Sequence, residues 1–484
     1  MTQTASSVDQ SQPNPVRIEK DLLGECPVPL DAYYGVQTQR AVDNFALTGV
    51  LLSHFPKLII GLAMVKKAAA HANADLGLLE ARRNEAIQYA CDRIIAGEFH
   101  DQFVVDMIQG GAGTSTNMNA NEVIANIGLE YLGHAKGAYK YLHPNNDVNM
   151  SQSTNDAYPT AIRVGLQLSH AELVDSLALL RDAFADKRDE FADVIKMGRT
   201  QLQDAVPMTM GQEFGAFATT LGEDIDRIAG NFDLLREVNL GGTAIGTGIN
   251  AHPRYANLAV EHLSRVCGHR MRLANDLIEA TSDMGAFVLF SGMTKRLAVK
   301  LSKICNDLRL LSSGPRTGFN EINLPARQPG SSIMPGKVNP VIPEAVNQVA
   351  YQVIGNDLAI TMAAENGQLQ LNVMEPLIAY KILESMRLLR RAMDMLRERC
   401  VVGITANRER CSELVHHSIG LITALNPYIG YDNATRIAKT ALANGQSVVT
   451  LVMEEGLLDP EQLAEILRPE RMVGPRAPEA AHAV

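Results

Sequence analysis

The sequence contains no tryptophan, and only 5% of its 484 residues are aromatic. Strands favour aromatic and β-branched side chains, so this scarcity favours helices over an extended sheet. Disorder as the dominant state is excluded, because 46% of the residues are hydrophobic and only 20% are charged. A chain of this length is expected to form about three domains with ample buried cores.

The sequence also lacks a net positive charge. Its formal net charge is −10, from 44 Lys and Arg against 54 Asp and Glu, and no block of basic residues occurs. Nucleic acids and anionic membranes bind basic surfaces, so neither is an expected partner. A small anionic substrate remains compatible with this charge, because one lysine placed in a pocket can dominate the local field.

The six cysteines lie singly along the chain, without a CxxC pair or the spacing of a zinc site. The adjacent His416 and His417 would point in different directions on a helix, so no metal site is predicted. Sparse free thiols are typical of a reducing compartment. Because the N-terminus lacks an apolar central region, and the apolar run from Leu58 to Val65 is too short to span a bilayer, we predict a cytoplasmic protein.

Apolar residues recur at helical spacing in four long segments. They occupy positions i, i+4, i+7 and i+11, which places them on one helix face. The stripes are Leu58, Leu62, Val65 and Ala69; Leu173, Leu177, Leu180 and Phe184; Leu297, Leu301, Ile304, Leu308 and Leu311; and Ile382, Met386, Leu389, Met393 and Leu396. No comparable series of alternating strands is visible. The pattern therefore predicts an all-α fold with a central bundle of long helices.

Breaks in the helical pattern predict three domains. An N-terminal helical domain would span residues 1–151, with a flexible tail over residues 1–16. A central helix-bundle domain would span residues 152–405. A small C-terminal helical domain would span residues 406–484 and would fray from Arg468, where the sequence becomes rich in proline and alanine.

Three segments interrupt the helices with small polar residues. They are residues 110–119, which include Thr114; residues 151–156, which include Ser153, Thr154 and Asn155; and residues 198–204, which include Thr200 and Gln201. Ser, Thr and Asn are good helix N-caps, and they are also neutral hydrogen-bonding groups. Each segment taken alone is therefore compatible with a helix cap or with a ligand-binding loop.

A fourth segment, residues 330–340, favours a functional loop. Its sequence GSSIMPGKVNP combines two adjacent hydroxyls, Ser331 and Ser332, with the cation of Lys337 and the amide of Asn339. Two glycines and two prolines free and fix the backbone at defined points, as a mobile active-site lid requires. Lys337 and Asn339 lie two residues apart in extended chain, so both can face one bound anion.

Residues 330–340 resemble the signature loop of the aspartase/fumarase superfamily. The three polar segments match its other shared regions in order and separation, and the resemblance extends from about Arg17 to about Gly456. It implies a three-domain, all-α fold whose long helices form a multi-helix core in a homotetramer, with each active site drawing on three subunits. It implies no required cofactor. Some members are activated by a divalent cation such as Mg²⁺, and the sequence leaves that point open.

Residues 241–248, GGTAIGTG, are a further glycine-rich segment. They lack the lysine and the preceding strand of a phosphate-binding loop, so no nucleotide site is predicted. By resemblance, they form a packed turn near the active site.

Two branches of the superfamily compete as the closer match. Fumarases, and some members of the ammonia-lyase branch, carry a histidine after the threonine of the GRT segment, where this chain has Gln201. In fumarases a glutamate pairs with that histidine, and it is present here as Glu344. A hydratase must handle water and its proton, so loss of the imidazole disfavours that chemistry. The segments GRTQLQDAVPMTMGQE and KICNDLRLLSSGPR resemble the ammonia-lyase branch. The resemblance implies reversible deamination of L-aspartate to fumarate, with the fumarase reaction as the alternative.

The resemblance also implies a role for each polar residue in an anti-elimination through an aci-carboxylate dianion. Ser331 would be the general base. The dianion would be bound by Thr114, Ser153, Thr154 and Ser332, the α-carboxylate by Lys337 and Asn339, and the amino group by Asn155, Thr200 and Gln201. A third reading, a non-catalytic structural relative, should have lost some of Thr114, Ser331, Lys337 or Asn339, and all four are present.

Overall fold

The computed structural model describes residues 15–474, and this part of the chain is predominantly helical. Its α-helices are α1 (Val36–Asn44), α2 (Pro56–Asp75), α3 (Ala81–Ile95), α4 (Thr114–Tyr131), α5 (Thr154–Glu190), α6 (Met210–Asn231), α7 (Tyr255–Cys267), α8 (Leu277–Ser282), α9 (Gly285–Leu311), α10 (Val341–Glu365), α11 (Glu375–Arg399), α12 (Arg408–His417), α13 (Ile422–Ile429), α14 (Tyr431–Asn444), α15 (Val448–Glu454), α16 (Pro460–Ile466) and α17 (Pro469–Met472). The predicted all-α fold class is confirmed.

The strands form four two-stranded sheets within the described range. They pair as β1 (Val16–Asp21) with β2 (Gly24–Pro29), β3 (Ile195–Thr200) with β4 (Gln203–Thr209), β5 (Glu237–Val238) with β6 (Arg272–Leu273), and β7 (Ile322–Asn323) with β8 (Thr405–Ala406). Only β5 and β6 are parallel; the other three pairs are antiparallel. Each pair is short, so these sheets are minor elements beside the helical framework.

The chain folds into two compact units, each built from three separate segments. Unit 1 comprises Met1–Glu172, Ile228–Thr294 and Gly355–Met386, and unit 2 comprises Leu173–Arg227, Lys295–Ile354 and Arg387–Val484. The three-domain division drawn from the sequence stays a prediction. β1 begins at Val16, within the tail predicted over residues 1–16, and α17 forms beyond Arg468, where fraying was predicted; the rest of those two tails, residues 1–14 and 475–484, lies outside the described residues.

The four apolar stripes predicted from the sequence are confirmed as buried helix faces. They lie on α2, α5, α9 and α11, and every member is buried. A fully buried side chain of this kind contributes about 1.5–3 kcal/mol through the hydrophobic effect. These stripes therefore supply much of the free energy that aligns the long helices.

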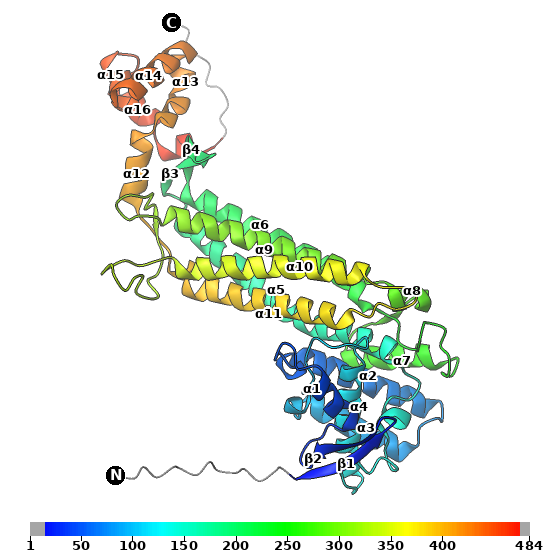
Figure 1. The fold of residues 1–484 in the computed structure, drawn as a ribbon. Coiled ribbons are helices and arrows are strands. Elements are labelled where there is room, and N and C mark those ends of the chain that lie inside the picture. The colour runs from blue at the N-terminus through cyan, green and yellow to red at the C-terminus, as the bar shows by residue number, and fades with distance from the viewer. Residues whose placement is uncertain (1–14, 475–484) are drawn as a thin grey trace, which may run out of the picture. The chain divides into compact units, whose positions relative to one another are not determined.

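The five longest helices lie side by side (Figure 1). Contacts between neighbours are the ring pair Phe184–Phe214 for α5 and α6, the ion pair Lys300–Asp224 for α9 and α6, the hydrogen bond from Asn347 to Ser302 for α10 and α9, and that from Asn356 to Ser385 for α10 and α11. Within residues 15–474, no helix is both long and apolar enough to cross a lipid bilayer.

Candidate active site

The N-termini of α4 and α5 lie next to each other in unit 1. α4 begins at Thr114 and α5 at Thr154, and the Nδ2 of Asn117 donates a hydrogen bond of 3.2 Å to Thr154 Oγ1. The helix dipole is positive at this end of each helix. Two adjacent N-termini therefore form a favourable environment for an anion. Thr114, Ser153 and Thr154, which the sequence predicts as dianion ligands, are brought to this place.

Gly113 makes the approach of the two helices possible. It has φ +91°, and a Cβ on it would lie 2.2 Å from the ring of Tyr158 in α5. Any larger residue would both clash with that ring and adopt a strained left-handed conformation. Gly113 thus serves helix packing and places Thr114 near the start of α5.

The glycine-rich turn at residues 241–248 packs against the start of α5, as the resemblance implied. Asn155 Nδ2 donates to the carbonyl oxygen of Ala244 at 2.7 Å. The buried carboxylate of Asp156 accepts from the backbone N–H groups of Gly241 and Thr243 at 2.9 and 3.0 Å. Burial raises the pKa of Asp156 to about 6, against the opposing effect of these N–H groups. Asp156 therefore holds the turn in place.

Thr200 and Gln201 lie at the exposed tip of the β3–β4 hairpin in unit 2. Gln201 and Leu202 form its two-residue turn, with φ values of 53° and 63°. Two central residues with positive φ indicate a type I′ turn, which normally favours Asn-Gly. A side chain in this conformation costs about 1–2 kcal/mol per residue. Strain of this kind clusters at functional sites.

A buried carboxylate anchors this hairpin. Glu321 is fully buried and forms ion pairs with Lys196 at 3.0 Å and with Arg199 at 2.8 Å. The guanidinium of Arg199 also lies 4.1 Å from the ring centroid of Phe319. The Cα atoms of Arg199 and Asp204 are opposite in the ladder, but the carboxylate bound by Arg199 is that of Glu321.

Replacing Glu321 with alanine is expected to destabilise the protein by about 3–5 kcal/mol, because Arg199 would lose its buried carboxylate and Lys196 would keep only its ion pair with Glu213. Burial alone would lower the pKa of Lys196, but Glu213 and Glu321 outweigh it and hold that pKa above its ordinary value. The contribution of the Lys196 ion pairs to the stability of the fold is therefore fully present below the ordinary lysine pKa. It is lost as pH rises through the higher pKa that Lys196 has in the folded protein. Urea unfolding measures the effect.

The control for this substitution is Glu413→Ala, which removes a surface partner of Arg410. An exposed ion pair of this type contributes roughly 0–1 kcal/mol. Equal losses in the free energy of unfolding from both substitutions would show that burial does not increase the contribution of Glu321 to stability.

The loop at residues 330–340 closes on itself in unit 2. The N–H of Gly330 donates to the carbonyl oxygen of Lys337 at 2.7 Å, and Asn339 Nδ2 donates to the carbonyl oxygen of Gly330 at 2.9 Å. A Cβ on Gly330 would lie 2.4 Å from that Lys337 oxygen, so only glycine fits at the closure point. Lys337 is exposed, as are the apolar side chains of Ile333 and Val338.

The hydroxyl oxygen of Ser331 accepts hydrogen bonds from two backbone N–H groups of this loop. The donors are those of Ile333 and Met334, each at 3.1 Å. Donors that point at a hydroxyl oxygen stabilise its ionised form. The loop geometry therefore lowers the cost of forming an alkoxide at Ser331.

The predicted residues thus fall into three clusters, one in unit 1 and two in unit 2. They are Thr114, Ser153, Thr154 and Asn155 at the helix N-termini; Thr200 and Gln201 on the hairpin; and Ser331, Ser332, Lys337 and Asn339 on the loop. Sequence reasoning missed the supporting residues Lys66 in unit 1 and Glu321 in unit 2, and it assigned no supporting role to Asn117 and Asp156 within the polar segments. Lys66 had a detectable signal, because it interrupts an alanine-rich helix on its apolar face.

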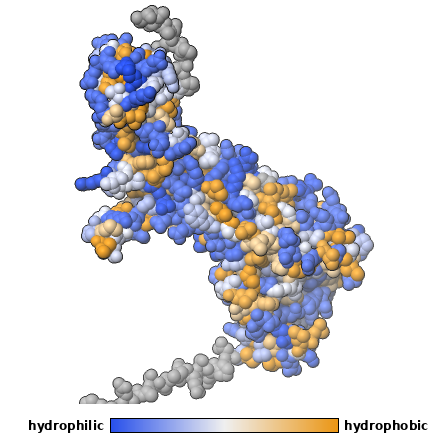
Figure 2. Space-filling model, turned by 45° about the horizontal axis from the view of Figure 1, so that its top comes forward, coloured by the Kyte–Doolittle hydropathy of each residue, from blue (hydrophilic) through white to orange (hydrophobic). Residues whose placement is uncertain are grey.

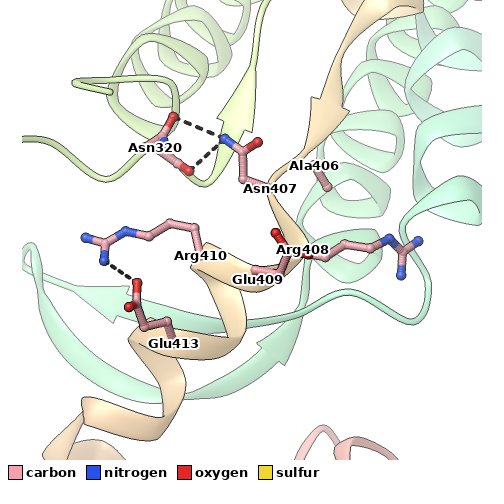
Figure 3. A pocket seen from close by; sticks show the side chains of 7 residues that line it. All are labelled: Asn320, Ala406, Asn407, Arg408, Glu409, Arg410 and Glu413. Carbon is pink, nitrogen blue, oxygen red and sulfur yellow. Dashed lines mark hydrogen bonds and ion pairs between the residues drawn. The ribbon is translucent and has the colours of Figure 1, made fainter. Parts of the chain in front are cut away.

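A polar pocket of about 580 Å³ lies elsewhere in unit 2 (Figure 3). It is lined by Asn320, Ala406, Asn407, Arg408, Glu409, Arg410 and Glu413. Asn407 donates to Asn320 across the pocket, and Arg410 pairs with Glu413. The lining includes none of the predicted site residues. Among residues 15–474, no group of three or more His, Cys, Asp or Glu could hold a metal ion.

Two family matches cover most of the chain. Residues 24–355 match the family described as Lyase, and residues 421–474 match the family described as Fumarase C C-terminus. Two aspartate ammonia-lyases are closely similar to this chain. That of Pseudomonas aeruginosa is 74% identical over 461 residues, which cover 95% of this chain and 97% of the relative. That of Escherichia coli K12 is 56% identical over 463 residues, which cover 96% and 97%.

Solved structures agree with these matches. A fumarate lyase:delta crystallin from Brucella melitensis, bound to cobalt, has 61% identity and a TM-score of 0.93, and covers 95% of this chain and 100% of that one. A class II fumarase from Schistosoma mansoni has 35% identity and a TM-score of 0.89, and covers 95% and 99%. Similarity to the fumarase is thus strong in fold and weaker in sequence.

Proposed function

The chain belongs to the aspartate ammonia-lyases of the aspartase/fumarase superfamily, and we propose that it catalyses the reversible elimination of ammonia from L-aspartate to give fumarate. It is a carbon–nitrogen lyase. The proposal rests on the adjacent N-termini of α4 and α5, where Thr114, Ser153 and Thr154 offer neutral hydroxyls to an anion. The 74% identity to an aspartate ammonia-lyase over nearly the whole chain supports the same conclusion.

Neutral donors suit the difficult step of this reaction. The Cβ proton of aspartate is weakly acidic, because the adjacent carboxylate is already charged. Its removal gives an aci-carboxylate dianion, which must be stabilised as it forms. Each preorganised donor to such a developing charge can be worth roughly 3 kcal/mol. Thr114, Ser153, Thr154 and Ser332 would provide these donors in the assembled site.

Ser331 would remove the Cβ proton. Its oxygen, stabilised as an alkoxide by the N–H groups of Ile333 and Met334, takes the proton and becomes a neutral hydroxyl. The electron pair of the broken C–H bond moves onto the β-carboxylate. It then forms the double bond of fumarate as the C–N bond to the protonated amino group breaks, and neutral ammonia leaves with the electron pair of that bond.

The remaining predicted residues would orient the substrate. Lys337 and Asn339 would bind the α-carboxylate, with the lysine supplying a charge-assisted hydrogen bond. Asn155, Thr200 and Gln201 would surround the amino group. A neutral Gln201 offers an amide oxygen to the departing ammonium, whereas it cannot exchange protons with water as an imidazole can. This difference favours the ammonia-lyase reaction over hydration.

We propose that these clusters meet between copies of the chain, in a homotetramer whose sites each draw on three subunits. Tyr351, Leu358 and Met362 lie at i, i+7 and i+11 on α10, and all three are more than half exposed. An exposed apolar stripe on a long helix fits a second copy of the same helix. Hydrophobic areas interrupt the polar surface in Figure 2. A cytoplasmic location is part of this proposal.

The function is tested by following fumarate absorbance with L-aspartate and with L-malate as separate substrates. We expect fumarate to form from L-aspartate and not from L-malate, and ammonia to appear in an equal molar amount. The reverse reaction should consume fumarate only when an ammonium salt is added. Fumarate from L-malate without fumarate from L-aspartate would identify a fumarase and contradict the proposal.

A further inference from the structure

Lys66 is a fully buried lysine directly behind the N-termini of α4 and α5. It lies on α2, and its Nζ donates three hydrogen bonds, to Asn117 Oδ1 at 2.7 Å, Asn149 Oδ1 at 2.8 Å and Gln152 Oε1 at 2.9 Å. An ammonium group has three N–H donors, so these three amide oxygens match it one to one. None of the ion pairs described for residues 15–474 includes Lys66.

A buried cation of this kind is costly to keep. Burial lowers the pKa of Lys66 to about 7, and the charges of Asp156 and Cys91 act in the opposite direction. An apolar residue at this position would avoid the cost of desolvating a charge, but it would leave the three amide oxygens around Nζ without this donor. The lysine therefore has a role in this polar network that an apolar residue cannot perform.

The lysine sets the direction of the hydrogen bonds around it. Because an ammonium group can only donate, each neighbouring amide must turn its oxygen toward Nζ and its nitrogen away. The nitrogen of Asn117 consequently points at the helix N-termini, where it donates to Thr154 Oγ1 at 3.2 Å and to Asn149 Oδ1 at 3.1 Å.

This direction decides what Thr154 can offer to a ligand. Its oxygen already accepts a hydrogen bond from Asn117, so its hydroxyl proton is left to donate. With the amide reversed, Thr154 would donate to the oxygen of Asn117 and would present lone pairs to an anion. Lone pairs that face a carboxylate repel it.

We propose that Lys66 is a positioning residue that acts through Asn117 to make Thr154 a hydrogen-bond donor to the β-carboxylate of the substrate. This inference rests on the proposed function. It assigns to Lys66 an effect that grows as negative charge develops, which separates it from a residue that only fills the core.

Two inhibitors separate these roles. The nitronate of 3-nitropropionate is a planar dianion and imitates the aci-carboxylate, whereas succinate imitates the ground-state dicarboxylate. We expect Lys66→Met to weaken nitronate binding by about 100-fold, the scale of losing one donor to a developing charge. The same substitution should weaken succinate binding by less than about 5-fold, because binding of a ground-state dicarboxylate depends little on this donor.

Lys67→Met is the matched control. Lys67 is the next residue on α2, and its Nζ pairs with Asp92 rather than with the amides behind the site. The substitution removes the same charge and should leave the affinities for both inhibitors within about 2-fold of the wild type. Equal nitronate losses in the two variants would refute the specific role of Lys66.

Asn117→Asp is a second variant that does not depend on how the fold tolerates Lys66→Met. The aspartate keeps the shape of the side chain and gains an ion pair with Lys66, which offsets the loss of the hydrogen bond to Asn149 Oδ1, so the variant should fold. Its second oxygen would accept the hydroxyl proton of Thr154 and reverse the hydrogen bond. We expect nitronate affinity to fall at least 10-fold more than succinate affinity.

A double-substitution cycle with Thr154→Val completes the test. In a chain without the hydroxyl, Asn117→Asp should lose most of its effect on nitronate affinity. Asn117→Asp with wild-type nitronate affinity would overturn the inference. Failure of the proposed function has a different signature, because the wild type itself would then bind neither inhibitor and would form no fumarate from L-aspartate.

Discussion

Replacing Ser331 with alanine is expected to lower kcat for L-aspartate by about 10³–10⁴-fold, at the upper end of what a general base contributes. The alanine removes the atom that takes the Cβ proton, whereas the two N–H groups that point at it and the backbone closure of the loop remain. Binding of succinate should stay within about 5-fold, because Ser331 is not a ligand of either carboxylate in the proposed site.

Steady-state kinetics and succinate inhibition measure the two quantities on the same preparations, and circular dichroism verifies the helical content. Val338→Ala is the control, since Val338 is an exposed side chain of the same loop. It should reduce kcat only slightly. If Ser331→Ala kept kcat within 10-fold of the wild type, another group would have to be the base.

The second large effect is expected for Lys337→Met, which should lower kcat/KM for L-aspartate by about 10²–10³-fold. Loss of one partner from a desolvated, hydrogen-bonded charge pair costs about 2–5 kcal/mol, and a tenfold change corresponds to about 1.4 kcal/mol. The α-carboxylate is charged throughout the reaction. The loss should therefore appear in ground-state binding as well, with succinate affinity falling by a similar factor.

A loss of succinate affinity distinguishes Lys337 from Ser331, because removal of the Ser331 hydroxyl should leave succinate affinity nearly unchanged. Lys303→Met is the control, because Lys303 pairs with Asp307 one turn away on the exposed side of α9. It should leave kcat/KM within about twofold. A Lys337→Met variant with normal succinate affinity would contradict the assignment of Lys337 to the α-carboxylate.

The helical framework could be predicted from the sequence because apolar spacing is a local property. Every stripe drawn from that spacing is buried in the structure, on α2, α5, α9 and α11. The loop at residues 330–340 could be singled out for a similar reason, since its chemistry is concentrated in eleven consecutive residues.

The support of the site was harder to predict, because it depends on residues far apart in sequence. Glu321 binds Arg199 across 122 positions of chain, and no spacing rule connects them. The left-handed turn at Gln201 has no sequence signal either, because it lacks the Asn-Gly pair that marks such turns.

Lys66 shows a different limit of sequence reasoning. It follows Ile59 and Leu62 by seven and four positions, so the helical pattern places it on the buried face of α2. Lysines are rarely fully buried, so this spacing alone does not predict that Lys66 is buried. Only the three amide oxygens around Nζ explain its position.

In the proposed assembly, residues of the two units form one active site only when separate copies of the chain come together. Mixing Thr114→Val with Ser331→Ala, after dissociation and reassembly in equal amounts, tests it most directly. Each variant alone should be nearly inactive. The mixture should recover about one quarter of wild-type activity, because each of two contributing copies carries the intact residue with a probability of about one half. A mixture as inactive as its components would contradict the claim.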